Sequence, residues 1–169
     1  DQNYPGNADI RVSYTLTEDD AVRIDYHMTC DEDTIANFTN HAYFNLAGQG
    51  SGSALGQKVW IDADQFTLSD QYCVPTGELA LVKDTPMDFT QFKAIGRDIE
   101  ADYEQLKLAG GYDHNWVLNH KTGELALSAK AMDEASGRVL EVYTDLPGIQ
   151  FYTANFLTHT EGKCHAVYD

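Results

Sequence analysis

Polar and hydrophobic residues alternate strictly in two neighbouring stretches, and this pattern constrains the fold more than any other feature of the chain. The hydrophobic positions are every second residue of 10–16 and of 22–28, beginning with Ile10 and Val22. A period of two places successive side chains on opposite faces of a β-strand. The acidic run 18–20 interrupts the alternation and marks a turn. The pattern predicts an antiparallel hairpin with one buried face and one face exposed to solvent.

Further short runs along the chain read as strands, each bounded by Gly, Pro or Asp. We expect strands at Lys58–Ile61, Gly123–Ala131, Val139–Tyr143 and Ile149–Ala154. Residues 48–56 are rich in Gly and Ser and predict a loop. One helix is expected over Asp98–Leu108, where Ile99, Tyr103 and Leu106 recur at helical spacing before two glycines. The chain is therefore expected to be all-β and mainly antiparallel, with one short helix, in a single domain over residues 1–169.

Acidic residues greatly outnumber basic ones, which restricts the partners that the chain can bind. Lys and Arg total 11 against 27 Asp and Glu, a formal net charge of -16. Such a surface repels phosphate and anionic lipid, so we expect no nucleic-acid partner and no membrane partner. The sequence has no apolar run that could span a bilayer and no signal segment. Cys30, Cys73 and Cys164 are sparse and form no CxxC pair, which favours a reducing compartment, and we expect a cytoplasmic protein.

Histidines are numerous enough to raise the question of a metal site. Such sites usually take two ligands from a tight spacing such as HxH or HExxH, and neither spacing occurs. His27 falls on the polar side of its strand and is expected to be exposed. We therefore expect no metal site. A glycosidase-type carboxylate pair stays open at this point, because the separation of two carboxylates is a property of the fold.

Three segments carry more polar and aromatic side chains than strand formation requires: 39–46, 110–116 and 146–157. In one interpretation, aromatic faces stack on a sugar while Asp, Asn, Gln and His bind its hydroxyl groups. In the other, the aromatic residues belong to the core and the polar residues form turns. Composition alone leaves both interpretations open.

The same segments carry a resemblance to a known family. The motifs Tyr4–Asn7, Thr39–Leu46, Gly111–Asn115 and Pro147–Leu157 resemble those of aldose 1-epimerases (galactose mutarotases), in the family's order and along the whole chain. The resemblance implies a large antiparallel β-sandwich, the supersandwich, with a sugar bound in a cleft on one face. It implies interconversion of the α and β anomers of free aldoses such as galactose and glucose, without a cofactor or a metal.

By the resemblance, four residues form the acid and binding half of the active site. His41 looks like the general acid that protonates the ring oxygen, and Tyr43 shares its strand face if the segment is extended. Asp113 looks like the carboxylate that holds sugar hydroxyl groups, and Gln150 like an amide ligand. The neighbours of Gln150 should then point to the opposite face and pack behind the cleft.

The chain departs from the family pattern in three places. An upstream Arg, an upstream His and a downstream Glu that acts as the base have no match, and both ends of the sequence look cut. We therefore expect a partial active site, with the base Glu absent from this chain. The alternatives are a non-catalytic carbohydrate-binding or sugar-sensing domain, and a structural β-domain without a ligand. Unpaired edges of an incomplete sandwich should favour self-association.

Overall fold

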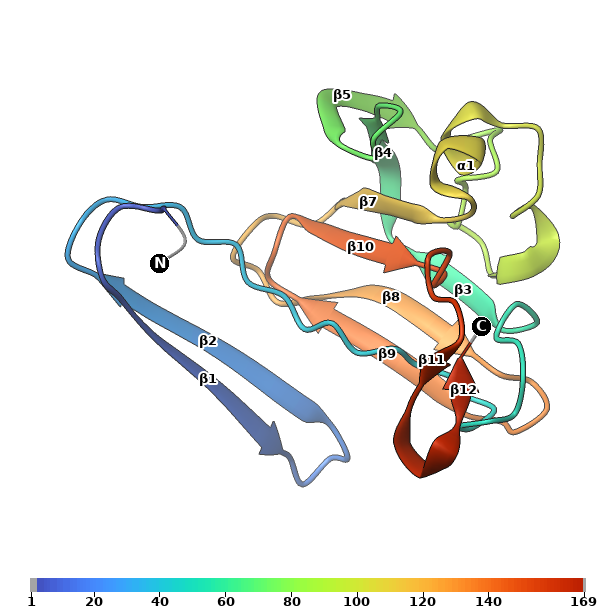
Figure 1. The fold of residues 1–169 in the computed structure, drawn as a ribbon, viewed down its shortest axis with the longest axis horizontal. Helices are drawn as coiled ribbons and strands as arrows, with labels where there is room; N and C mark the ends of the chain where they lie inside the picture. Colours follow the sequence, from blue (N-terminus) through green and yellow to red (C-terminus); the bar gives the residue numbers. More distant parts are fainter. Residues whose placement is uncertain (1–2, 169) are drawn as a thin grey trace. The chain divides into compact units, whose positions relative to one another are not determined.

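The computed structural model describes residues 3–168, which fall into two compact units with the boundary between Tyr43 and Phe44 (Figure 1). Each unit has its own hydrogen-bonded sheets, and each is described by itself below. The expectation of a single domain over 1–169 stays a prediction.

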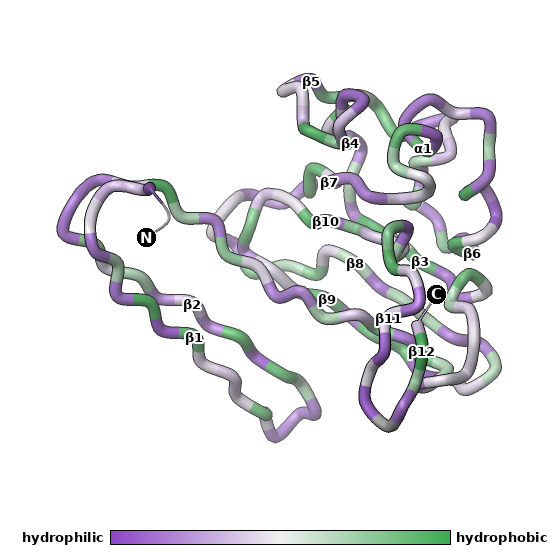
Figure 2. Tube along the Cα trace, viewed as in Figure 1, coloured by the Kyte–Doolittle hydropathy of each residue, from purple (hydrophilic) through white to green (hydrophobic). Residues whose placement is uncertain are grey.

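The first unit contains the predicted hairpin. Strand β1 (Ala8–Leu16) pairs antiparallel with β2 (Val22–Cys30), in a register that places Val12 opposite Tyr26. The turn is closed by a bond from the Thr17 amide to the Ala21 carbonyl, 2.8 Å long. Period-two alternation is the reason for this pairing, because it gives both strands a matching apolar face. The alternation of hydropathy along the two strands is visible in Figure 2. The hairpin prediction is confirmed.

The prediction that this apolar face is buried is wrong for β1. All nine residues of β1 are exposed, and Leu16 keeps 79% of its surface accessible. On β2, Tyr26 is half-buried because its ring stacks on Phe38, with centroids 5.7 Å apart. The segment that follows β2 thus covers Tyr26, whereas on β1 it contributes a hydrogen bond from Asn40 to the hydroxyl of Tyr14, which stays exposed. His27 is exposed, as predicted.

The second unit contains two four-stranded antiparallel sheets and one two-stranded sheet. The first sheet has the order β10-β7-β4-β5, the second β6-β3-β8-β9, and β11 pairs with β12. The bounds are β3 (Lys58–Ile61), β4 (Ala63–Ser69), β5 (Pro75–Leu81), β6 (Lys93–Ala94), β7 (Asp113–Leu118), β8 (Ala126–Met132), β9 (Val139–Thr144), β10 (Gly148–Tyr152), β11 (Thr160–Glu161) and β12 (Val167–Tyr168). The antiparallel, all-β expectation is confirmed.

The two four-stranded sheets enclose one hydrophobic core. Ile61 of β3 and Ala129 of β8 pack in the same cluster as Phe66 of β4 and Trp116 of β7. The chain passes directly from one sheet to the other between β3 and β4, with Asp62 as the connecting residue. Asp62 joins both layers, because its amide donates to Ser128 and its carbonyl accepts from Asn119.

Several predicted strands have shifted ends, and others were missed. The strand expected from Gly123 begins at Ala126, since Gly123 has a φ of +87° and lies in a turn. The strand expected to reach Ala154 ends at Tyr152, since Ala154 is left-handed with a φ of 61°. Strands β4, β5, β6, β7, β11 and β12 were not predicted. Residues 48–56 form turns and irregular chain, in agreement with the predicted loop.

The single predicted helix is much shorter than expected. Helix α1 spans Glu104–Ala109 and ends at Gly110, which is left-handed and donates its amide to Leu106. Residues 98–103 are instead turns, preceded by the 3-10 helix η1 (Ile95–Arg97), and a second one, η2, spans Lys163–His165. Ile99 and Tyr103 pack on the core without a helix, so their spacing was misleading. Within residues 3–168 no helix is long and apolar enough to cross a bilayer.

Candidate functional site

Two of the predicted site residues meet on the open face of neighbouring strands. Asp113 is the first residue of β7, and Gln150 lies in the middle of β10. The Gln150 Nε2 donates to Asp113 Oδ1 at 2.8 Å. In the register, Asp113 faces Tyr152 and Gln150 faces Asn115, so this bond joins a diagonal pair on one face. A carboxylate thus lies beside an amide, rather than beside a second carboxylate.

The opposite face of the same strands belongs to the core. Trp116 and Tyr112 are completely buried, and Ile149 and Phe151 pack against them, as expected for the neighbours of Gln150. Trp116 and Tyr112 therefore cannot stack on a sugar from this position, and the stacking interpretation is wrong for these two rings. The competing interpretation, in which the aromatic residues are core, holds for Tyr112, Trp116 and Phe151, whereas Phe156 of the third segment is exposed.

Polar side chains continue the open face beyond Asp113 and Gln150. Asn115 lies opposite Gln150, and its Nδ2 donates to Thr67 Oγ1 on β4 at 3.1 Å. A Cβ at Gly148 would lie 2.4 Å from Asn115 Oδ1, so glycine leaves room for this amide. The two-residue step from Asp113 to Asn115 could have indicated Asn115. Nothing local in the sequence indicates Thr67, which arrives through the pairing of β4 with β7.

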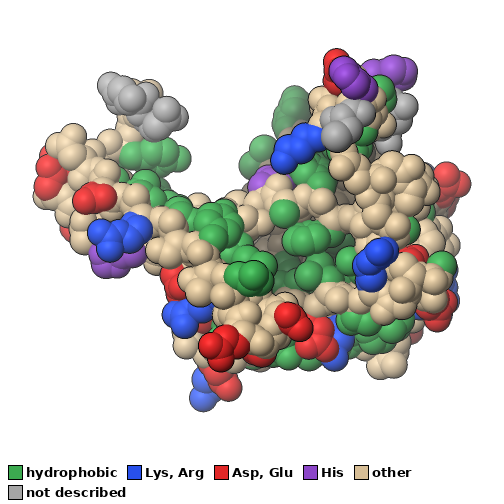
Figure 3. All heavy atoms as spheres, turned by 90° about the horizontal axis from the view of Figure 1, so that it is seen from below, with side chains coloured by type: hydrophobic (Ala, Val, Ile, Leu, Met, Phe, Trp, Pro, Cys, Tyr) green, Lys and Arg blue, Asp and Glu red, His purple; other side chains and the backbone are tan. Residues whose placement is uncertain are grey.

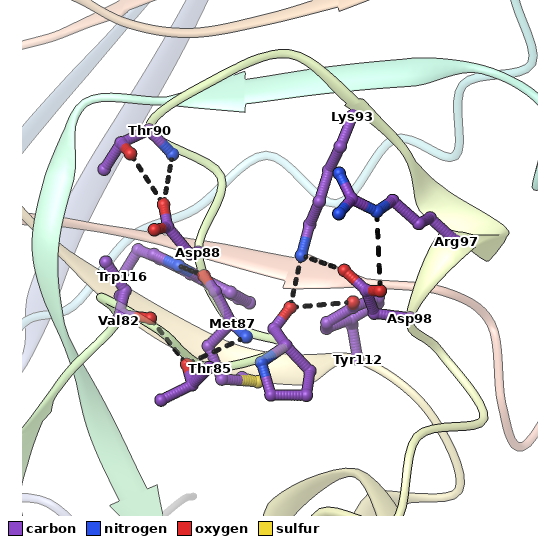
Figure 4. Close-up of polar contacts among 11 residues, drawn as sticks. Val82, Thr85, Met87, Asp88, Thr90, Lys93, Arg97, Asp98, Tyr112 and Trp116 are labelled. Atoms are coloured by element: carbon purple, nitrogen blue, oxygen red, sulfur yellow. Dashed lines mark hydrogen bonds and ion pairs between the residues drawn. The ribbon is translucent and has the colours of Figure 1, made fainter.

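A polar loop between β5 and β6 fixes the two large core rings (Figure 4). Tyr112 donates its hydroxyl to the Pro86 carbonyl at 3.0 Å, and Trp116 Nε1 donates to the Met87 carbonyl at 3.1 Å. The Lys93 ammonium donates to the same Pro86 carbonyl and forms a 2.9 Å ion pair with Asp98. Burial lowers the pKa of Lys93, and Asp98 offsets part of this effect. Burial also raises the pKa of Tyr112 well above its usual range, which keeps its hydroxyl protonated as a donor.

His114 lies in the core between the two candidate site residues Asp113 and Asn115. It is 1% exposed, and its Nδ1 accepts the Asp113 amide at 3.2 Å. Its Nε2 has no hydrogen-bond partner among the described residues. Burial lowers the pKa of His114, and the charge of Asp113 offsets this only in part. His114 is consequently a neutral core residue whose second nitrogen is unsatisfied.

The other two predicted site residues belong to the first unit. His41 and Tyr43 lie in an exposed segment without regular structure, and their ring centroids are 5.2 Å apart at an interplanar angle of 40°. Their two-residue spacing therefore brings the rings together, as expected. The four predicted residues form two pairs, His41 with Tyr43 on the first unit and Asp113 with Gln150 on the second.

The metal-ligating residue types are dispersed. Across residues 3–168, no group of three or more His, Cys, Asp or Glu side chains could hold a metal ion. Cys30 and Cys73 are free thiols, and the side chain of Cys164 lies outside the described part of the chain.

Solved structures of similar proteins share this architecture. An aldose epimerase homologue from C. elegans matches with a TM-score of 0.86 and 32% identity, over 99% of this chain and 49% of that chain. Galactose 1-epimerase from Lactobacillus acidophilus NCFM matches with a TM-score of 0.81 and 30% identity, over 93% of this chain and 44% of that chain. The galactose mutarotase-like fold expected from the resemblance is thereby confirmed.

Sequence comparisons lead to the same group of proteins. Galactose mutarotase from Sus scrofa is 41% identical over 169 residues, and aldose 1-epimerase from Escherichia coli (strain K12) is 37% identical over 163 residues. These alignments cover 99% and 96% of this chain but 47% and 46% of the relatives, so the chain spans about half their length. The sequence model described as Aldose 1-epimerase matches residues 1–168. With a match of this extent, the chain belongs to the aldose 1-epimerase family.

Proposed function

We propose that this chain provides the acid and the hydroxyl-binding residues for the interconversion of aldose anomers. The observation that carries the proposal is the Asp113–Gln150 pair on the open face of β7 and β10. A carboxylate accepts hydrogen bonds from two hydroxyl groups, and an amide can both donate and accept. The substrate class is a free hexose such as galactose or glucose, as the names of the relatives suggest.

The proposed reaction opens and closes the sugar ring. A base removes the proton from the anomeric hydroxyl while His41 protonates the ring oxygen, and the bond between C1 and that oxygen breaks. The open aldehyde rotates about C1–C2. Closure on the other carbonyl face returns both protons and gives the other anomer. In this proposal the base is a Glu that this chain does not supply.

The residue types suit these roles. Histidine exchanges protons near neutral pH, which is what a group that both gives and recovers a proton requires. His41 is exposed, so a sugar can reach its imidazole, and Tyr43 lies against the same ring. We also place the reaction in the cytoplasm, which suits the free thiols of Cys30 and Cys73.

The test is anomer exchange of fresh α-D-galactose and α-D-glucose, followed by NMR with buffer alone, with this chain, and with a chain extended at both ends to the length of the relatives, which would supply the base. We expect His41→Ala to lower any acceleration by about 10²–10⁴-fold, the usual contribution of a general acid. His27→Ala is the matched control, because His27 is an exposed histidine on the same unit. Equal loss in both variants, or full activity in His41→Ala, would contradict the assignment of His41 as the acid.

The alternative function is a carbohydrate-binding domain without catalysis. The observation in its favour is that the Asp113–Gln150 pair is held by the second unit, without His41. It predicts saturable binding of an aldose that Asp113→Ala abolishes, with no acceleration of anomer exchange. A folded chain that neither binds an aldose nor accelerates the exchange would exclude both functions for this chain.

A further inference from the structure

Asp113 lies at the end of the β7–β10 ladder, where strand pairing is weakest. The pair Asp113–Tyr152 is the last of the β7–β10 ladder. Immediately before it, the chain leaves α1 through two glycines with positive φ, Gly110 and Gly111. Ladder ends open more readily than ladder centres, because each terminal pair has a neighbour on one side only. An additional restraint is needed if the carboxylate of Asp113 is to stay beside Gln150.

The side chain of Asn155 supplies such a restraint from just beyond the end of β10. Its Nδ2 donates to the carbonyl of Ala109 at 3.0 Å and to the carbonyl of Tyr112 at 2.9 Å. Its Oδ1 accepts from Thr153 Oγ1 at 2.6 Å. Both amide hydrogens and the oxygen are therefore used. Through these bonds one side chain connects the end of α1, the residue before Asp113, and Thr153, which directly follows the strand that carries Gln150.

Thr153 holds the backbone of Tyr112 at both its carbonyl and its amide. The Tyr112 carbonyl also accepts the Thr153 amide at 3.0 Å, and the Tyr112 amide donates to Thr153 Oγ1 at 3.0 Å. The side chain of Tyr112 is fixed separately by the Pro86 carbonyl, next to Lys93 (Figure 4). With its backbone and its ring both restrained, Tyr112 determines where the following residue begins.

The local backbone accepts strain to make this arrangement. Ala154 has a φ of 61°, a left-handed conformation that is unfavourable for a residue with a Cβ. Strained residues persist where the surrounding structure determines their conformation, and they are found preferentially at functional sites. Gly111 is also required, because a Cβ there would lie 2.4 Å from Asn155 Oδ1.

We propose that Asn155 is a positioning residue for Asp113: it fixes the Tyr112–Asp113 peptide so that the carboxylate meets the amide of Gln150. Asn155 acts through Tyr112 and does not itself contact the sugar. The effect on sugar affinity rests on the proposed function, whereas the effect on the Asp113–Gln150 bond does not.

The test variant is Asn155→Asp, which keeps the size of the side chain and removes both donors. The first readout needs no sugar: it is the NMR signal of the Gln150 side-chain amide, assigned by its loss in Gln150→Ala. Asp113→Ala defines the position of this signal when its partner is absent. We expect Asn155→Asp to move the signal toward that position.

The matched control is Asn119→Asp at the other end of β7. Asn119 also bridges two segments, since its Nδ2 donates to Asp62 at 2.9 Å and its Oδ1 accepts the Asp64 amide. It makes no contact with Tyr112 in the hydrogen bonds described. We expect Asn119→Asp to lower stability and to leave the Gln150 amide signal unchanged.

The second readout is affinity for galactose or glucose. We expect Asn155→Asp to weaken it by up to about a hundredfold, the cost of an ångström-scale displacement, and Asn119→Asp to leave it unchanged. If the unaltered chain binds no sugar, the proposed function fails, while the amide signal still decides the role of Asn155.

Thr153→Val is a second test variant, for use if Asn155→Asp does not fold. This variant keeps the branched shape of Thr153 and removes the hydroxyl that bonds to Asn155 and to the Tyr112 amide. A folded Asn155→Asp or Thr153→Val protein with the original Gln150 amide signal would overturn the proposal. So would an equal shift of that signal in Asn119→Asp.

Discussion

At the level of a single residue, the protonation state of His114 affects the stability of the core beneath the candidate site. The imidazole is buried among Phe66 and Trp116, which meet it edge-on with centroids 5.9 and 6.4 Å away. Burial disfavours the charged imidazolium and lowers the pKa of His114 in the folded chain. A protonated His114 would also carry a hydrogen on Nδ1, which would then face the Asp113 amide whose hydrogen bond Nδ1 accepts in the neutral ring.

Stability should therefore fall as the solution becomes acidic. The unfolded chain binds a proton at His114 near the ordinary histidine pKa of about 6.5, whereas the folded chain binds it only at lower pH. Above about pH 6.5 both states are neutral and the contribution is complete. Between that pH and the lowered folded pKa, the free energy of unfolding should fall by at most about 1.4 kcal/mol per pH unit.

Urea unfolding at a series of pH values measures this loss. Wild type should lose more stability on acidification than His114→Gln, whereas the exposed-site variant His27→Gln should follow wild type. Direct NMR titration of His114 is the independent check if His114→Gln does not fold. A His114 pKa at or above its ordinary value would contradict the interpretation.

Among the elements, the hairpin of β1 and β2 is the one most prone to associate with other chains. The residues of β1 that face the apolar side are exposed, and hydrophobic side chains are plainly visible on the molecular surface in Figure 3. Within residues 3–168 both strands also have an unpaired edge, because they form a sheet of two. Apolar faces and free edges favour association with other chains.

We expect the isolated chain to self-associate through this face in a concentration-dependent manner. Val12→Lys should shift it toward monomer, since Val12 lies on the apolar side opposite Tyr26. Ser13→Lys adds the same charge on the polar side, opposite Asp25, and should have little effect. Sedimentation velocity over a range of concentrations distinguishes the two. A monomer at all concentrations, or an equal effect of both variants, would count against the prediction.

The elements also differ in how well the sequence predicts them. The hairpin was predictable because its alternation is strict and local. Strand β7 was missed because polar side chains occupy both of its faces: Asp113 and Asn115 on the open face and His114 in the core. Hydropathy then no longer reports burial, although burial itself alternates along the strand. The helix was overestimated because Ile99 packs on the core from a turn.

On the scale of the whole molecule, the two units should differ in local stability. Among the described residues, β1 and β2 pair only with each other, whereas β4 and β7 lie inside a four-stranded sheet over the core. A two-stranded hairpin is marginally stable by itself. Hydrogen exchange followed by mass spectrometry should therefore show faster exchange in β1 and β2 than in β4 and β7. Equal protection in the two units would contradict this expectation.

The candidate site was predictable only where it is local or carried by a family motif. The His41–Tyr43 contact follows from a spacing of two residues. The Asp113–Gln150 contact depends on the register of strands 37 positions apart in the sequence, which no local pattern encodes. The bonds of Asn155 depend on that register and on the left-handed turn at Ala154, so they appear only once the sheet is formed.

The direct passage from β3 to β4 has a practical consequence for dividing the protein into two pieces. Because Asp62 is bonded to both layers, a break between 58 and 69 would cut the chain where it connects the two sheets of the sandwich. A two-fragment reporter should instead be opened between Gly48 and Gly52, where an added Cβ at either glycine would meet nothing within 4 Å. Such a cut would leave the connection from β3 to β4 intact inside one fragment.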